Sequence, residues 1–457
     1  MPLEPGVEGT PEVHIDHPVE VVLLDDAGPY GTQDLLVALP IQGLPLDPGR
    51  SYEVEVLGDR FTFTTQDPTA EQALLTQTAR ALPTPEPGEW TAAEVFEHYC
   101  VYESTLDMPV YQQGEPPFQT EGGTFAWEGG EPVLQGYETA RIVVTIPHGP
   151  APAEGWPTVV FSRTGGGGER PLVDHGPADA EGEIMPGTGV ALDFAAVGWA
   201  GVSVDGPHGG LRNVTGGDEQ FLMFNILNPG AMRDNVRQSA LELALLPAAL
   251  QAVDIQGECS GSLDTDRLVL MGHSMGATIV PLTLAQGGYL GGILSGAGGS
   301  WIHNIVHKQS PLEVRPIAEA MLDHPGLSEH SPTLSLVQWA GESADPPVYG
   351  AQIQEQGLHI LQIQGIVDTY ILPPMANATS LSLGLDLAGP SLDAEHPELA
   401  QFTPYEELIE LGGGELVEEL TSKAVAQYPE DGLQGGHEVL FQRAEPREHI
   451  RDFLEGL

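Results

Sequence analysis

The feature that most constrains this 457-residue chain is a serine flanked by glycines, in Gly272-His273-Ser274-Met275-Gly276. Apolar residues 268–271 precede this motif, and the mostly apolar residues 277–282 follow it. The pattern predicts a buried strand, a tight turn and a helix, with the serine hydroxyl exposed on the turn. The glycines remove side chains that would clash in such a turn, and the helix N-terminus favours negative charge beside it. We therefore predict that Ser274 is a nucleophile.

A serine nucleophile needs a base within hydrogen-bond reach and an acid that orients the base. Asp368 follows a short apolar segment that we expect to be a late strand, and we predict it as the acid. His437 lies in a glycine-containing loop before the C-terminal helix, and we predict it as the base. Asp345 is the alternative acid, and His449 is the alternative base, although we expect His449 to lie within the last helix.

Two backbone N–H groups should stabilise the negative charge that develops on the substrate oxygen. We expect one from Met275, the residue after the serine. The other should come from the glycine-rich segment 162–168, where Gly165 is the first candidate and Thr164 the second. A flexible surface loop is the alternative interpretation of that segment.

Three aromatic residues could line an apolar substrate pocket, although each is explained equally well as part of the core: Trp301, Tyr370 and Trp339. The sequence contains none of the common glycine-rich phosphate-binding motifs, zinc-binding His-Glu motifs or EF-hand loops. We therefore expect no metal and no cofactor.

From residue 156 onward, short apolar runs alternate with longer helical segments. This is the pattern of a mostly parallel sheet that helices cover on both faces, which is an α/β fold. Residues 300–352 and 377–434 do not follow it. We expect both segments to form helical caps over the C-terminal edge of the sheet, where ligands bind in such folds.

The first part of the chain has a different pattern. Residues 1–70 contain short alternating runs separated by turn signals and resemble a small β-rich, Ig-like module. Residues 71–138 should connect this module to the rest through helices and strands. A helix is expected over residues 69–82, and Thr91-Ala92-Ala93-Glu94 has the capping-box pattern that predicts the start of another helix.

The charge is strongly acidic, with 66 Asp and Glu against 16 Lys and Arg and a formal net charge of −50. Such a surface repels nucleic acids and anionic membranes, so neither is an expected partner. It fits a device for solubility and equally an adaptation to high salt, where charges are screened. No apolar stretch approaches the roughly 18–20 residues needed to span a bilayer, and no signal peptide is visible. Cys100 and Cys259 could form one disulfide of an exported protein or remain two buried thiols.

The chain resembles the α/β-hydrolase superfamily, and within it the bacterial exported lipases and esterases sometimes labelled virulence-factor lipases. The resemblance covers roughly residues 140–457, through Gly201 to Gly209, Arg233 to Gln238, Gly272 to Gly276, Ala344 to Tyr349, Gly365 to Tyr370 and Gly436-His437.

The resemblance implies an α/β-hydrolase domain over residues 139–457, export from a bacterial cell, and cleavage of small or polymeric carboxylic esters by Ser274, His437 and Asp368. One departure is that Arg163-Thr164 stands where the family usually has His-Gly, so the second oxyanion donor does not carry over. The alternative is a binding or adhesion protein that uses its N-terminal β-rich module and carries a degenerate hydrolase domain.

Overall fold

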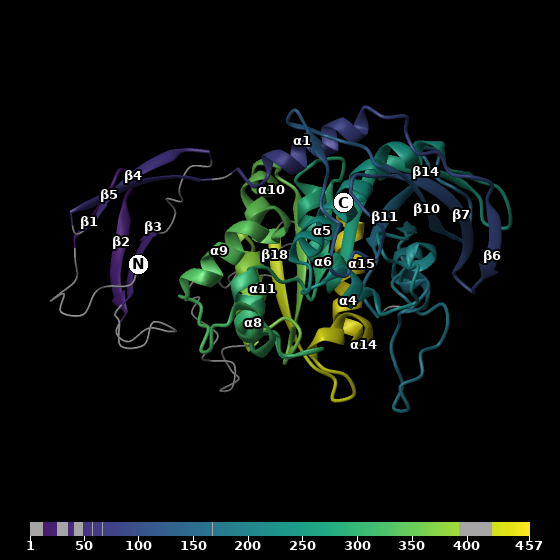
Figure 1. Cartoon of the computed structure of the whole chain (residues 1–457). Coiled ribbons are helices and arrows are strands. Elements are labelled where there is room, and N and C mark those ends of the chain that lie inside the picture. The colour runs from purple at the N-terminus through teal and green to yellow at the C-terminus, as the bar shows by residue number, and fades with distance from the viewer. Residues whose placement is uncertain are drawn as a thin grey trace. The chain divides into compact units, whose positions relative to one another are not determined.

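The computed structural model describes residues 12–24, 35–40, 49–56, 58–65, 67–166, 168–392 and 423–457 (Figure 1). The chain forms two compact units. The smaller unit consists of Met1–Glu71 with Trp301–Glu342, and the larger of Gln72–Ser300 with Ser343–Leu457. The division at residues 70 and 138 that the sequence suggests stays a prediction.

The described part of the smaller unit contains the expected β-rich start of the chain. Its strands form an antiparallel sheet in the order β1-β4-β5 and a separate pair, β2-β3. The Tyr52 ring is buried on this sheet and stacks on Phe63, with 5.6 Å between ring centroids. The Ig-like character of this region stays a prediction. The elements are β1 (Val13–Ile15), β2 (Val19–Leu24), β3 (Leu35–Pro40), β4 (Ser51–Val56), β5 (Asp59–Thr64), α7 (Trp301–His307), α8 (Val314–Leu322) and α9 (Pro332–Gly341).

A large sheet forms the centre of the larger unit, in the order β17-β18-β16-β15-β14-β11-β12-β10-β7-β6. Neighbouring strands are parallel from β17 to β12 and antiparallel from β12 to β6. With the serine turn after β14, this is the sheet of the α/β-hydrolase fold. Its strands are β6 (Thr91–Val95), β7 (Tyr99–Val110), β10 (Gly136–Pro147), β11 (Trp156–Ser162), β12 (Ala200–Val204), β14 (Gly261–His273), β15 (Gly291–Ser295), β16 (His359–Ile366), β17 (Asp386–Ala388) and β18 (Lys423–Pro429).

Helices cover both faces of this sheet (Figure 1). Ile293 of β15 belongs to an apolar cluster that includes Phe194 of α3 and Phe453 of α15. Its neighbour Gly292 faces Leu284 of α6, and adjacent strand residues point to opposite faces. The helices are α1 (Ala70–Arg80), α2 (Pro171–Asp174), α3 (Ala191–Ala196), α4 (Glu219–Met223), α5 (Pro229–Ala249), α6 (Met275–Leu284), α10 (Gly350–Gln356), α11 (Pro373–Ser382), α14 (Val439–Gln442) and α15 (Ala444–Glu455); β8 (Trp127–Glu128), β9 (Glu131–Pro132) and β13 (Asp254–Ile255) are short strands.

Two predictions about secondary structure are wrong. Thr91–Val95, where a helix was expected to begin, is the edge strand β6, because its backbone pairs with β7. Asp386–Ala388 and Lys423–Pro429, expected within a helical cap, are the sheet strands β17 and β18. Both strands depend on pairing with distant residues, which overrides weak local signals. Residues 393–422 of that expected cap lie outside the described residues, and the position of both caps over the sheet stays a prediction.

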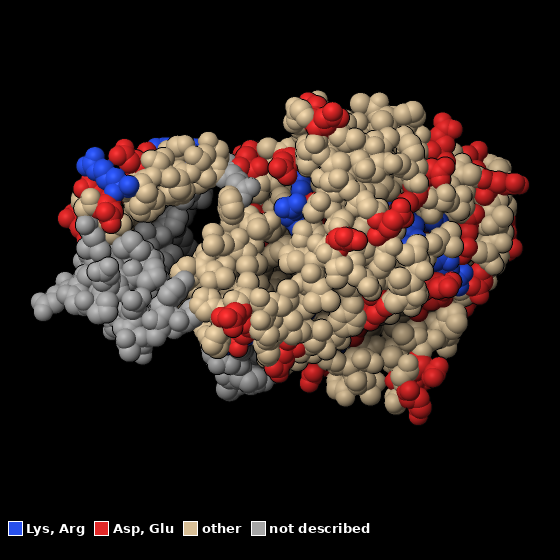
Figure 2. All heavy atoms as spheres, in the orientation of Figure 1, with Lys and Arg blue, Asp and Glu red and all other residues tan. Residues whose placement is uncertain are grey.

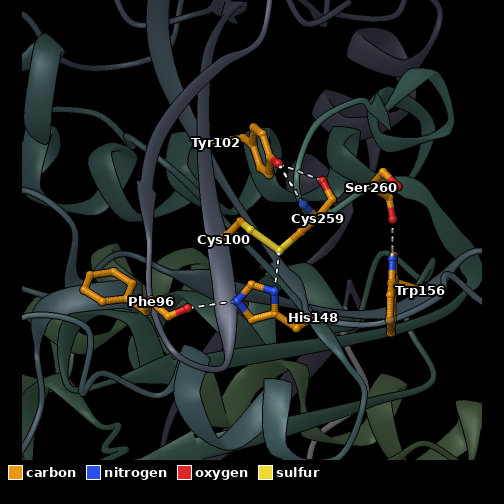
Figure 3. Close-up of a disulfide and its surroundings, with 7 residues drawn as sticks. All are labelled: Phe96, Cys100, Tyr102, His148, Trp156, Cys259 and Ser260. Carbon is orange, nitrogen blue, oxygen red and sulfur yellow. Dashed lines mark hydrogen bonds between the residues drawn. A yellow bond between two sulfur atoms is a disulfide. The ribbon is translucent and has the colours of Figure 1, made fainter.

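A disulfide joins Cys100 of β7 to Cys259, which lies 159 residues away and shortly before β14 (Figure 3). The Tyr102 hydroxyl donates to the Cys259 carbonyl oxygen at 2.7 Å and accepts from the Cys259 N–H at 3.2 Å. The Trp156 indole donates to the Ser260 carbonyl oxygen at 3.1 Å. The bond and the Tyr102 contacts attach the segment before β14 to β7 in the antiparallel part of the sheet, and the Trp156 contact attaches it to β11 in the parallel part.

Reduction of this disulfide is expected to lower the free energy of unfolding by about 2–5 kcal/mol, because it releases a long loop in the unfolded chain. Thermal and urea unfolding, followed by circular dichroism with and without a phosphine reductant, would measure the change. A Cys100→Ser, Cys259→Ser double variant should not respond to the reductant. Equal stability of the oxidised and reduced protein would contradict the prediction.

Acidic side chains are spread over the visible face of the molecule and basic ones are few (Figure 2). This agrees with the net charge of −50. Among the helices that the structure describes, none combines the length and the hydropathy needed to cross a bilayer.

Candidate active site

Ser274 lies on the turn between β14 and α6, as the motif predicts. Its backbone has φ 52° and ψ −114°, a conformation that is rare outside glycine and costs about 1–3 kcal/mol. The Ser274 N–H donates to the Ser295 carbonyl oxygen at 2.8 Å, which fixes the turn to β15. The serine side chain is partly exposed, whereas His273 and Met275 beside it are buried. The turn therefore leaves Ser274 partly accessible between two buried neighbours.

The two glycines of the motif are required by close backbone contacts. A Cβ atom on Gly272 would lie 2.4 Å from the Gly276 carbonyl carbon. A Cβ atom on Gly276 would lie 2.6 Å from the Ser162 carbonyl oxygen at the end of β11. Any larger residue would push α6 away from the strand ends, so the glycines bring the helix N-terminus up to the serine.

The structure brings Ser274, His437 and Asp368 together in one hydrogen-bonded chain. The His437 Nε2 lies 2.8 Å from the Ser274 Oγ, and the His437 Nδ1 lies 2.8 Å from the Asp368 Oδ2. An ionised carboxylate can only accept hydrogen bonds, so Nδ1 carries the proton and donates. Nε2 is then the acceptor, and it can take the hydroxyl proton of the serine.

The Asp368 carboxylate is held on both sides. Its Oδ1 accepts from the backbone N–H groups of Tyr370 at 2.7 Å and Ile371 at 2.8 Å, which leaves Oδ2 for His437. The two alternative residues lie elsewhere: the Asp345 Oδ1 accepts from the Ser300 N–H, and the His449 Nδ1 bonds to the Tyr428 hydroxyl.

The loops that carry the acid and the base are in direct backbone contact. The Gly436 N–H donates to the Val367 carbonyl oxygen at 2.8 Å. A Cβ atom on Gly436 would lie 2.6 Å from the carbonyl carbon and oxygen of Val367, and one on Gly365 would lie 1.6 Å from the Gly436 carbonyl oxygen. These glycines therefore set the distance between the two loops.

Aromatic rings enclose His437. Tyr370 stacks on it, with ring centroids 4.5 Å apart and an angle of 15° between the planes. His273 lies 4.9 Å away, and its Nδ1 bonds to the Ser295 hydroxyl at 3.1 Å. Burial lowers the pKa of His273 well below its ordinary value, so His273 is neutral and packs beside the base.

The predicted oxyanion residues lie on two segments that meet. Met275 begins α6, whose next residue, Gly276, closely approaches the end of β11. Thr164 follows β11, is buried, and its hydroxyl has no hydrogen-bond partner among the described residues. Gly165 packs against Gln220, since a Cβ atom there would lie 2.8 Å from the Gln220 Cβ. Gly167 of this segment lies outside the described residues.

Arg163, which departs from the family pattern, anchors this segment. It is buried and forms a bidentate pair with Glu219 and a second ion pair with Asp205. Its guanidinium also donates to the carbonyl oxygens of Gly168 at 2.6 Å and Glu169 at 2.8 Å. The arginine therefore closes the glycine-rich loop on itself rather than pointing a free charge at a substrate.

The three aromatic pocket candidates have different positions. Tyr370 lies at the site, stacked on His437. Trp301 and Trp339 belong to the smaller unit, where Trp301 packs against Gly341 and Trp339 is 52% exposed. A role for the two tryptophans in binding substrate stays a prediction.

Two side chains at the site, Glu438 and His175, were not predicted. The Glu438 Oε2 lies 3.3 Å from the His175 Nε2, and the His175 ring stacks on Phe441 with centroids 3.9 Å apart. The sequence offers one signal for Glu438, which is its place directly after His437. His175 comes from a distant segment and carries no such signal.

Within the described residues, two groups of side chains have potential metal-ligand atoms within 4.8 Å of one another. In one of them, His437 already uses both ring nitrogens in bonds to Ser274 and Asp368. In the other, Cys100 and Cys259 are joined to each other beside His148.

Comparison with models of protein families and with curated proteins gave no match. Solved structures similar to this chain include acetyl xylan esterase 1 from Thermoanaerobacterium sp. JW/SL YS485, at 14% identity and a TM-score of 0.47, covering 85% of this chain and 93% of that chain. Another is an acetyl xylan esterase from Paenibacillus sp. R4, at 13% identity and a TM-score of 0.41, covering 66% and 80%. A third is a CE15 glucuronoyl esterase from Teredinibacter turnerae T7901, at 14% identity and a TM-score of 0.40, covering 81% and 78%.

Proposed function

We propose that this protein is a serine hydrolase of carboxylic esters, of the carboxylesterase or lipase type, that acts on neutral acyl esters through a covalent acyl-enzyme. The observation that carries the proposal is the hydrogen-bonded chain from Ser274 through His437 to Asp368 on a strained turn. Strain at such a turn is retained where the position of a reactive group depends on it. Polymeric esters are included among the proposed substrates, because the serine stands on a partly exposed turn.

In the proposed reaction, the Ser274 Oγ attacks the ester carbonyl carbon while its proton passes to the His437 Nε2. The carbonyl oxygen becomes an oxyanion, and we assign its stabilisation to the Met275 N–H and to a donor from Thr164 or Gly165. The tetrahedral intermediate then collapses, and His437 returns the proton to the leaving alkoxide. A water molecule, deprotonated by the same nitrogen, then attacks the acyl carbon. The bond from this carbon to the Ser274 Oγ breaks, His437 returns the proton to the Ser274 Oγ, and the carboxylic acid is released.

The first test is hydrolysis of p-nitrophenyl esters, from acetate to longer acyl chains, followed by triglycerides and polyesters. Labelling by a fluorophosphonate, detected as a single mass increase located on the peptide that contains Ser274, would support the proposed nucleophile. A protein that neither turns over these esters nor reacts with the fluorophosphonate would instead favour the binding or adhesion function.

Neutral esters are expected to be hydrolysed at least about tenfold faster, in kcat/KM, than matched esters that carry a carboxylate. Two arginines could in principle attract a carboxylate. Arg163 lies within the glycine-rich segment 162–168, and Arg212 follows β12. Arg212 is neutralised by Glu242 and Glu138, as Arg163 is by Glu219 and Asp205. Neither offers a free cation to oppose the net charge of −50.

The measurement compares p-nitrophenyl butyrate with p-nitrophenyl hemisuccinate, which have similar length. Molar NaCl should reduce the difference, because it screens the field of the protein. Equal kcat/KM for both esters at low salt would reject the preference.

We also propose that the protein is exported from a bacterial cell, to the periplasm, the surface or the medium. The disulfide between Cys100 and Cys259 supports this, because such bonds persist in oxidising compartments and are rare in the cytosol. Alkylation of the protein in intact native cells, followed by mass spectrometry, tests it. Both cysteines should resist alkylation unless a reductant is added first.

A further inference from the structure

A second carboxylate lies beside the proposed base. A carboxylate oxygen of Glu438, a ring nitrogen of His437 and a ring nitrogen of His273 lie within 4.8 Å of one another. The Glu438 Oε1 is 4.0 Å from the His273 Nε2, which is too long for a hydrogen bond. Glu438 can therefore act on His437 through its charge, without replacing the bond from Asp368.

His175 holds this carboxylate in place. The His175 Nε2 lies 3.3 Å from the Glu438 Oε2, and it is the donor because an ionised carboxylate only accepts. The His175 ring is parallel to Phe441 within 10°, at 3.9 Å. Phe441 lies in α14, directly after the loop that carries His437, whereas His175 follows α2 and the glycine-rich loop. One histidine thus fixes both Glu438 and the helix behind the base.

The charge on Glu438 persists at acidic pH. Burial alone would raise the pKa of this carboxyl, but the hydrogen bond that His175 donates is the largest of the effects that lower the pKa below its ordinary value. The carboxylate is therefore ionised throughout the pH range in which a histidine base changes its protonation state.

Two other groups beside the base, His273 and Tyr370, do not cancel this charge. His273 is neutral, because burial lowers its pKa. Burial also raises the pKa of Tyr370, followed by the fields of Glu438, Asp368 and Asp218, so the phenol is neutral as well. His437 thus faces two carboxylates, Asp368 through a hydrogen bond and Glu438 at a longer distance.

We propose that Glu438 is a positioning residue that stabilises the imidazolium form of His437 during acyl transfer, and that His175 keeps Glu438 in reach. This inference rests on the proposed ester hydrolysis. In the reaction, the proton moves from the Ser274 hydroxyl to the His437 Nε2, and the charge that forms on the ring is balanced by two carboxylates, one hydrogen-bonded and one acting through space.

The decisive variant is Glu438→Gln, which keeps the shape and an acceptor for His175 while removing the charge. We expect kcat to fall about 3–10-fold with KM nearly unchanged, and the acidic limb of the kcat/KM profile to move to lower pH by roughly half a unit or more. Glu438→Asp, which keeps the charge, should restore much of both values. His175→Phe keeps the stacking on Phe441 but removes the donor, and should give an intermediate loss of kcat.

The matched control is Glu430→Gln, which removes an exposed carboxylate from the same loop and changes the net charge equally. It should leave kcat and the pH profile within about twofold of the original protein. The effect of Glu438→Gln should also be larger in an Asp368→Asn background, where Glu438 is the remaining charge beside His437.

A readout that does not need activity separates this inference from the proposed function. In a Ser274→Ala protein, the NMR titration midpoint of the His437 ring should move to lower pH when Glu438→Gln is added. A midpoint and a pH profile that both stay unchanged in Glu438→Gln would overturn the inference, even if the protein hydrolyses esters. Absence of ester hydrolysis in the original protein, with a shifted midpoint, would reject the proposed function instead.

Discussion

Replacement of Ser274 by alanine is expected to reduce ester hydrolysis by about 10⁴–10⁶-fold, because the acyl-enzyme can no longer form. The Ser274 Oγ lies 2.8 Å from the His437 Nε2 and is the hydroxyl in the hydrogen-bonded series Ser274–His437–Asp368. The fold should persist, since alanine removes one partly exposed oxygen and leaves the turn backbone in place. Initial rates on p-nitrophenyl acetate and the melting temperature measure both expectations.

The control for Ser274→Ala needs a serine that takes no part in the hydrogen bonds between Ser274, His437 and Asp368. Ser382 in α11 is suitable, because its hydroxyl donates to the local Thr379 carbonyl oxygen at 2.8 Å. Ser382→Ala should retain nearly full activity. If Ser274→Ala kept more than a few per cent of the original rate, or if it lost activity by unfolding, Ser274 would not be established as the nucleophile.

Alanine at Gly436 is expected to reduce kcat by at least about 10²-fold, whereas alanine at the adjacent Gly435 should have little effect. The Cβ atom at position 436 would lie 2.6 Å from the backbone of Val367, which cannot move like the end of a flexible side chain. The loop must then shift, and both 2.8 Å bonds of His437 lengthen. The variant should also lose about 1–3 kcal/mol of stability.

Gly435 provides a control from the next position in the chain. Its φ is −66°, which any residue adopts, and the nearest atom to its Cβ position is the Val367 carbonyl oxygen at 4.0 Å. Gly435→Ala should remain within about threefold of the original kcat. Equal losses of kcat in Gly436→Ala and Gly435→Ala would mean that the loop responds to any added side chain. Full activity in both variants would mean that the loops of Asp368 and His437 tolerate a larger separation. Either result would contradict the prediction.

Much of the fold was predictable, because short runs of neighbouring residues indicate many of its strands. The apolar runs at residues 158–161, 201–204, 268–271 and 292–294 lie in strands of the sheet, and the run at 358–363 does so from residue 359 onward. These strands are apolar on both faces because helices cover both sides of the sheet. Their apolar pattern can therefore be recognised without knowing which strands are neighbours. The edge strands β6 and β17 escaped prediction because they carry few apolar residues or are very short. β18, which lies between β17 and β16, escaped because residues 377–434 do not follow the strand–helix pattern.

The sequence by itself determined the serine turn and the order of the three proposed active-site residues. Ser274 needs Gly272 and Gly276 at fixed spacing, and that requirement is visible in consecutive residues. Asp368 and His437 follow from their places after a strand and before the last helix, so their types and order were also accessible.

Only the tertiary structure decided which groups surround these three residues. Cys100 and Cys259 are 159 residues apart, and their pairing depends on how β7 and the start of β14 meet. The contact of His175 with Glu438 and the ion pair of Arg163 with Glu219 likewise join segments that are distant in sequence. Short-range sequence patterns encode turns and strands, because those depend on neighbouring residues. Charge pairing and the environment of a base depend on which segments the sheet brings together, and that information exists only in three dimensions.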